Sequence, residues 1–477
     1  MSEYHQKEVL NAGALGTYRV HSLFTRISSE GDLEPEGEEP FKYAVALHAH
    51  EFTHYLHNLT TIAGIDSLTA CFWLVVPFVK NADERGYFTA PEGIEEDENL
   101  KLAFKAMNCA RGSVELAPNS LDGKWPVITE WEFGKPVEDF VSLTHSVHGD
   151  IGKIPVCSLR VIAKPKAGAP IEMSLRPGLD FISEGVAYEI EREQCRLVGI
   201  NGRDLDSQTP SYPYLAYRPL VEHFVGRETT AEERIRIGSA ALMTFTPSAS
   251  LFLLCSAMRQ DFERGDGEQT VFERATNYLA QQFQSYRAMP DLSPMVQIRE
   301  VMGGSADLRK GAEIYGRLLD KGLDLRVRQP MMELSLIKQA IAPSDFNQVA
   351  SELLEHLVCQ EKVELPHHIS WIGAPGSIAE ISDEELQGLS VLQTSIHYLQ
   401  QHFTKDGRLG NTADLPDAAC PFEGACPIQA NSLDPEMCSK KPWQVSAAGG
   451  KGVCWYEAGR LSLRLDRQAI KAHSSTS

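Results

Sequence analysis

The sequence predicts an α+β protein, with a small sheet set between helical regions. Residues 113–177 contain short segments that are rich in β-branched residues and bounded by Gly and Pro, which is typical of strands. Apolar residues recur at helical spacing before this region, from Ala44, and after it, in residues 178–194. From residue 229 to residue 403 the pattern is almost wholly helical.

The chain of 477 residues is long enough for more than one domain. We expect three parts: a sheet-containing core in residues 1–228, a helical region in residues 229–405 and a Cys-rich C-terminal segment in residues 406–477. The clearest candidate strands are residues 125–128 and 154–162, and the clearest later helices are residues 269–284, 306–319, 346–360 and 383–403.

Composition excludes some functions. The formal net charge of -20 argues against a broad nucleic-acid surface, because phosphate binding requires clustered Lys and Arg, and it also disfavours binding to anionic membranes. The polar, acidic start (residues 1–8) lacks the order of a secretory signal, so we expect a cytoplasmic protein. The apolar stretches 67–79 and 237–258 are expected to be core helices, the second interrupted near Pro247.

A short motif lies on the first of these helices, which should begin near Phe41 or Lys42 and end near Gly64. The motif is His50-Glu51-Phe52-Thr53-His54. Residues four apart lie on one face of a helix, so the two imidazoles can direct a nitrogen at one metal ion. Glu51 is rotated away from the metal but is close enough to act as general base for a water. Its neighbours are uncharged, as expected of a buried helix.

With this motif the chain resembles the zincin metallopeptidases, and within them the gluzincins. A second segment, Ser183-Glu184-Gly185-Val186-Ala187-Tyr188, resembles the gluzincin helix that supplies a glutamate as third ligand. The resemblance implies a zincin-like metallohydrolase core in residues 1–228, with His50, His54 and Glu184 on zinc and Glu51 as base. Glu184 follows His54 by 130 positions, so the strand-rich segment must fold back between the two helices.

The residues alone leave other third ligands open, namely Asp66, His145, His148 and Asp150. Asp66 is expected instead to cap the next helix. Three more residues share a face with the expected ligands and could orient them: His57 on the first helix, and Tyr188 and Glu191 after Glu184.

Ten cysteines fall into two groups. Six are scattered and are expected to be buried free thiols. Cys420, Cys426, Cys438 and Cys454 lie within thirty-five residues of Pro/Gly-rich chain, and they could hold a structural zinc or an iron–sulfur cluster, or remain free or paired.

The expected function is a zinc metallopeptidase with one catalytic Zn²⁺ and a protein or peptide substrate. Two alternatives stay open: a catalytically silent scaffold that binds a partner protein through its helical region, and a zinc hydrolase of non-peptide amides. Glu51 favours hydrolysis, since a scaffold that only binds zinc has no need of a base.

Overall fold

The computed structural model describes residues 16–18, 24–94, 97–117, 121, 125–145, 149–264, 270–288, 306–363, 366–373, 382–404, 408–426, 435–445 and 454–464. It is 57% helix and 16% strand, with the strands in small sheets, so the expected α+β class is confirmed.

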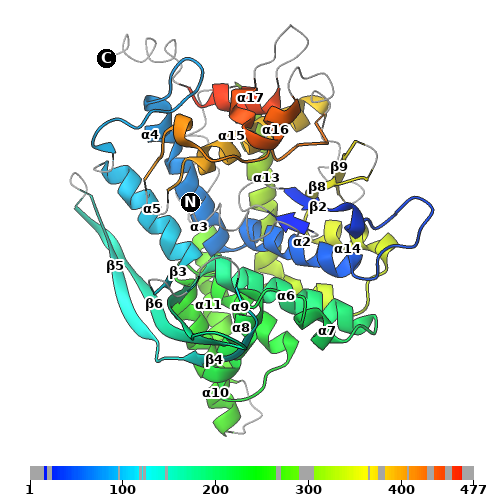
Figure 1. Cartoon of the computed structure of the whole chain (residues 1–477). Coiled ribbons are helices and arrows are strands. Elements are labelled where there is room, and N and C mark those ends of the chain that lie inside the picture. The colour runs from blue at the N-terminus through cyan, green and yellow to red at the C-terminus, as the bar shows by residue number, and fades with distance from the viewer. Residues whose placement is uncertain are drawn as a thin grey trace.

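The helices form most of the molecule (Figure 1). They are α2 (Ala44–Thr60), α3 (Ile62–Trp73), α4 (Val75–Lys80), α5 (Glu98–Arg111), α6 (Leu179–Leu197), α7 (Gly202–Asp206), α8 (Tyr214–Val225), α9 (Ala231–Leu242), α10 (Pro247–Arg264), α11 (Val271–Arg287), α13 (Ala306–Arg328), α14 (Pro343–Leu353), α15 (Asp383–Gln401), α16 (Pro435–Lys440) and α17 (Trp455–Ser462). Short 3-10 helices are η1 (Ser29–Gly31), η4 (Met332–Ile337), η5 (Thr412–Asp414) and η7 (Pro442–Gln444).

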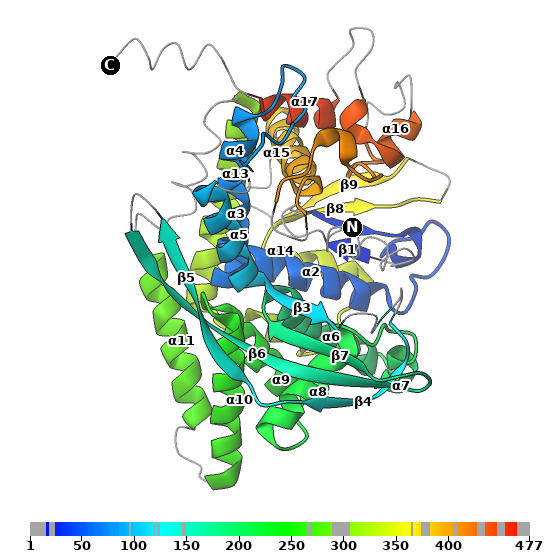
Figure 2. The same cartoon turned by 60° about the vertical axis from the view of Figure 1, so that its left-hand side comes forward.

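The strands form two sheets. They are β1 (Gly16–Tyr18), β2 (Phe24–Ile27), β3 (Gly112–Leu116), β4 (Ile128–Phe133), β5 (Val137–His145), β6 (Gly149–Pro165), β7 (Ile171–Pro177), β8 (His356–Gln360) and β9 (His368–Ile372). The first sheet has the order β1-β2-β8-β9, and its β2–β8 pair is parallel. The second has the order β3-β7-β6-β4, with β5 paired to β6 (Figure 2). This second sheet confirms the strand expected over residues 154–162, which lies within β6, whereas the strand expected over residues 125–128 is wrong, because β4 begins only at Ile128.

Helix α2 lies between the first sheet and α6, as both views show (Figures 1 and 2). It contacts β1 and β2 on one side and α6 on the other, and it also packs against α3 and α13. Nearly every one of its residues is buried, which confirms the expected buried helix and explains its uncharged composition.

The junction of α2 with α3 differs from the prediction. The first helix ends at Thr60 rather than at Gly64, because the Thr61 side chain accepts a hydrogen bond from the Gly64 N–H and so caps α3. Gly64 is needed for close packing instead: a Cβ there would lie 2.4 Å from the His57 carbonyl oxygen. Asp66 lies inside α3, so its expected capping role is wrong.

In residues 229–403 most of the helical prediction is confirmed, including a break before Pro247, where α10 begins. The helix expected over residues 346–360 is wrong at its C-terminal end. It stops at Leu353, and β8 follows, buried between β2 and β9 with hydrogen bonds to both. Hydrogen bonding of β8 to a strand on each side stabilises the extended conformation, even though the local sequence pattern favours a helix.

Among the described residues, a large hydrophobic core extends from Phe24 to Leu463, and a second, smaller cluster includes Ala46, Tyr188 and Cys195. The stretch Ile62–Lys80 is long and apolar enough to cross a membrane, but 72% of it is buried inside the fold, as in a core helix. The division into three segments stays a prediction.

Candidate metal centre

Two helices bring the expected metal ligands together. His50 and His54 lie one turn apart on α2, and Glu184 lies on α6, which packs against α2. Glu184 Oε2 is 3.6 Å from His50 Nε2 and 3.2 Å from His54 Nε2. One ligand atom from each of the three residues lies within 4.8 Å of the others. Among the described residues, this is the group that could hold a metal ion.

The other ring nitrogen of each histidine is held by α6. His50 Nδ1 lies 2.7 Å from Glu191 Oε2, and His54 Nδ1 lies 2.9 Å from Ser183 Oγ. A hydrogen bond at Nδ1 fixes both the tautomer and the orientation of the ring, and leaves the Nε2 lone pair for a metal. Glu191 therefore has the orienting role expected of it, and Ser183 is an orienting residue that the sequence pattern did not indicate.

Ser183 joins His54 to His57. Its Oγ is 2.9 Å from His57 Nδ1 as well as from His54 Nδ1, and a hydroxyl has only one proton to donate. When His54 Nδ1–H donates to Ser183, the hydroxyl donates to His57 Nδ1, and His57 carries its own proton on Nε2. This arrangement leaves His54 Nε2 unprotonated, as a metal ligand requires.

The chain of contacts ends on a buried ion pair. His57 Nε2 lies 3.2 Å from Glu333 Oε1 on η4, and Glu333 accepts two hydrogen bonds from Arg326 on α13. Burial opposes ionisation of Glu333, but Arg326 and His57 outweigh it and hold the pKa of this carboxyl well below its usual range. Arg326 also donates to Thr60 Oγ1 on α2. His57 thus connects the ligand His54 to the helical region.

Glu51 lies beside the three ligands but outside the group that they form. Its carboxylate accepts a hydrogen bond from the backbone N–H of Tyr18 on β1. Burial raises the pKa of Glu51 to about 8; the His50 charge lowers it, and the charges of Glu184 and Glu191 raise it. A carboxyl with a pKa near neutrality suits proton transfer.

The acidic groups around His50 and His54 favour a bound cation. Three carboxylates, those of Glu51, Glu184 and Glu191, surround two imidazoles in a buried site. Burial lowers the pKa of His50, but hydrogen bonds to Glu184 and Glu191 raise it well above the usual value overall. A metal cation bound at the Nε2 atoms would replace the proton on His50 as the counter-charge of these acidic groups.

Tyr214, at the start of α8, is a further residue of the site that the sequence pattern did not indicate. Its ring centroid lies 5.7 Å from that of His50. Burial, the charges of Glu184, Glu51 and Glu191, and a hydrogen bond to Glu184 raise its pKa well above the usual value. The phenol is therefore a hydrogen-bond donor at any ordinary pH.

Tyr188 does not have the role expected of it. Its hydroxyl donates to Asp206 Oδ1 at 2.7 Å, and Asp206 is also paired with Arg192. The charged Asp206 at the end of α7 draws the hydroxyl away from His50 and His54, and the Tyr188 ring instead packs edge-on against Tyr214.

Of the alternative ligands, Asp66 is described in the structure and does not belong to the group. Asp66 lies on α3, where burial raises its pKa to about 7. His145 and Asp150 belong to β5 and β6, but their side chains lie outside the described part of the structure, as does His148 altogether.

Among the described residues, the C-terminal cysteines form no disulfide bond. Cys420 and Cys438 are buried, and Cys426 and Cys454 are half-buried. The six scattered cysteines are free and buried, as expected.

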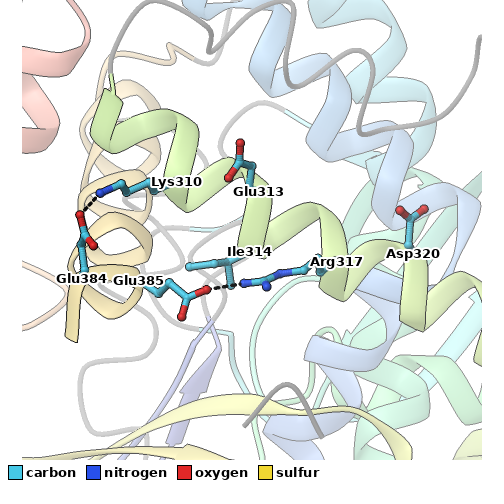
Figure 3. A pocket seen from close by; sticks show the side chains of 7 residues that line it. All are labelled: Lys310, Glu313, Ile314, Arg317, Asp320, Glu384 and Glu385. Atoms are coloured by element: carbon cyan, nitrogen blue, oxygen red, sulfur yellow. Dashed lines mark hydrogen bonds and ion pairs between the residues drawn. The ribbon is translucent and has the colours of Figure 1, made fainter. Parts of the chain in front are cut away.

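A pocket of about 520 Å³ lies elsewhere, between α13 and the start of α15 (Figure 3). Its walls carry the ion pairs Lys310–Glu384 and Arg317–Glu385. It shares no residue with the metal group.

Comparison of the chain with protein-family models, with curated proteins and with solved structures finds no match.

Proposed function

We propose that the chain is a zinc-dependent hydrolase that cleaves peptide bonds. The observation that carries this proposal is the convergence of two imidazole Nε2 atoms and the Glu184 carboxylate beside a buried glutamate that is not one of the ligands. Two His and one Glu with a separate base form a donor set that suits catalytic zinc. When bound, zinc would lower the pKa of a coordinated water and polarise the carbonyl under attack.

Two side chains, those of Glu51 and Tyr214, would take part in the reaction beside the metal. Glu51 is placed to accept a proton from the attacking water and to return it to the leaving amine, and a metal cation beside it would favour the ionised carboxylate that the first step requires. The protonated phenol of Tyr214 is placed to donate a hydrogen bond to the oxygen that becomes negative in the transition state.

The position of β1 supports a peptide as substrate. Among the described strands β1 is the edge of its sheet, and it lies directly against Glu51: a Cβ on Gly16 would be 3.0 Å from Glu51 Oε1. An unpaired strand edge can hydrogen-bond an extended peptide along its backbone. A peptide bound in this way would present a carbonyl to Glu51, whereas a small amide would gain nothing from the strand.

The test combines metal content with cleavage. Zinc per chain is measured for the purified protein, and a peptide library from a digested proteome is incubated with it and read by mass spectrometry. The Glu51→Gln variant keeps the shape of the side chain, so zinc content should be unchanged while cleavage falls ~10²–10⁴-fold.

Glu172→Gln is the matched control, because Glu172 is exposed on β7 and should leave cleavage unchanged. A zinc-loaded wild type that cleaves no peptide in the library would refute the proposal. Full activity of Glu51→Gln would refute the role of the base.

A further inference from the structure

The four C-terminal cysteines lie on three short pieces of chain. Cys420 and Cys426 flank the turn formed by residues 421–425, Cys438 lies in α16, and Cys454 is the residue before α17. These pieces gather beside α15, at the top of the molecule (Figures 1 and 2).

Direct contacts hold the pieces together. The Cys420 N–H donates to the Cys438 carbonyl at 2.6 Å, which places the turn against α16. Phe422 in the turn packs edge-on against Trp455, with ring centroids 5.1 Å apart, so the start of α17 lies against the same turn. The first contact joins two of the four cysteines directly. In the second, Phe422 lies two positions from Cys420 and Trp455 lies next to Cys454.

The environment of Cys420 shows that the other three thiols are near it. Burial is the main reason for its raised pKa, and the charges of Cys454, Cys438 and Cys426 raise it further. The shifts of the six scattered thiols have burial as their main cause, and no other thiol contributes to them. Four thiols around one point are therefore particular to this segment of the chain.

Cys420 also receives a hydrogen bond from the backbone N–H of Phe422. An N–H directed at sulfur stabilises a thiolate rather than a thiol, and such bonds are typical of sulfur ligands to metals. A buried structural thiol has no need of this contact.

The spacing of the thiols distinguishes between metals. A zinc with Zn–S bonds of about 2.3 Å draws its sulfur ligands to within about 4 Å of one another. Among the described residues, the group whose ligand atoms lie within 4.8 Å is His50, His54 and Glu184, and no three of these cysteines meet that limit. An iron–sulfur cluster holds several metal and sulfide atoms between its ligands, so it takes cysteines that are set wider apart.

We propose that Cys420, Cys426, Cys438 and Cys454 ligate an iron–sulfur cluster, separate from the catalytic metal. The cluster would join the turn, α16 and α17 to one another. Such a link would add to the packing of Phe422, Trp443 and Tyr456, which already attach these pieces to the hydrophobic core.

The test is made on the full chain, produced and purified without oxygen. Iron, acid-labile sulfide and zinc per chain are measured, and the visible absorption is recorded before and after reduction with dithionite. We expect iron and sulfide in equal amounts, together with a visible absorption that reduction bleaches. Cys426→Ser should lose most of the iron and sulfide and keep the catalytic zinc; the position is half-buried, so the change disturbs packing little.

Cys255→Ser is the control, because Cys255 is a buried thiol in α10 with no thiol neighbour, and it should keep the iron. His50→Ala should lose zinc and keep iron, which separates this site from the proposed catalytic one. If the wild type contained a second zinc instead of iron, and Cys426→Ser lost that zinc, the proposal of an iron–sulfur cluster would be overturned. If Cys426→Ser contained the same amounts of iron and zinc as the wild type, the proposal of a metal site at these cysteines would be overturned.

Discussion

The Nε2 atom of His57 lies 3.2 Å from Oε1 of Glu333, and neither side chain has any exposed surface. His57 belongs to α2, the helix that carries the candidate ligands His50 and His54, and Glu333 lies 276 positions later, on η4. Through Ser183, this contact connects the imidazole of His54 to the ion pair of Glu333 with Arg326.

Glu333→Gln should lower the free energy of unfolding by about 3–5 kcal/mol, because it leaves the guanidinium of Arg326 buried without a counter-charge. Denaturant unfolding at neutral pH measures the change. Glu172→Gln, in the exposed pair with Arg160, should leave stability unchanged. A Glu333→Gln protein as stable as the wild type would contradict the importance of the pair.

Ser183→Ala should weaken metal binding by about 10–100-fold, because His54 loses the hydrogen bond that fixes its ring. Competition with a chelator of known zinc affinity gives the ratio. Ser207→Ala, an exposed serine after α7, is the control and should bind zinc as the wild type does. An unchanged zinc affinity in Ser183→Ala would show that α2 alone holds His54 in place.

Tyr214→Phe should lower kcat by about 10²–10³-fold with little change in zinc content, because it removes a donor to the developing oxyanion. Tyr188→Phe should leave kcat nearly unchanged, since its hydroxyl is engaged by Asp206. Equal effects of the two changes on kcat would remove Tyr214 from the proposed mechanism.

Three buried histidines should each destabilise the fold as the pH is lowered from about 6.5 to about 4, against the opposite effect of Glu51 and Asp66, whose raised pKa values favour the folded state over the same range. Burial lowers the pKa of His48 to about 4 and the pKa values of His356 and His402 to about 3, against 6.5 for an ordinary histidine. The unfolded chain therefore takes up protons that the folded chain does not, at a cost of about 2 kcal/mol per imidazole at pH 5.

Urea unfolding at pH 7 and pH 5 measures this loss of stability. His402→Gln should lose less stability than the wild type between these two values, because it lacks one of the three buried imidazoles. If the free energy of unfolding of the wild type and of His402→Gln changed by the same amount between pH 7 and pH 5, the prediction would be contradicted.

Helical spacing made much of the candidate site predictable. His50 and His54 are four apart on α2, while Glu184 and Glu191 are seven apart on α6, so each pair lies on one face of its helix. The spacing determines on which face of the helix a residue lies, but it does not determine where the polar group at the end of its side chain points. Tyr188 shares the face of Glu184, yet a charged partner on α7 draws its hydroxyl elsewhere.

Residues that reach the site from distant elements could not be predicted. Tyr214 and Glu333 have no periodic relation to the motif, and only tertiary packing places them there. The same holds for β8, whose residues are nearly all buried and so show no alternation of apolar and polar residues. Its strand conformation depends on partners that the local sequence does not contain.

The parallel pairing of β2 with β8 sets an order of events during synthesis. Residues 24–27 pair with residues 357–360, and β1, which lies over Glu51, pairs with β2 and also contacts α2. A nascent chain that has emerged from the ribosome as far as residue 228 already contains His50, Glu51, His54 and Glu184. This nascent chain has no β8, so the four-stranded sheet to which β1 belongs cannot yet form. If the proposed hydrolase uses the complete sheet to bind peptides, it becomes competent only after residues 356–360 have been made.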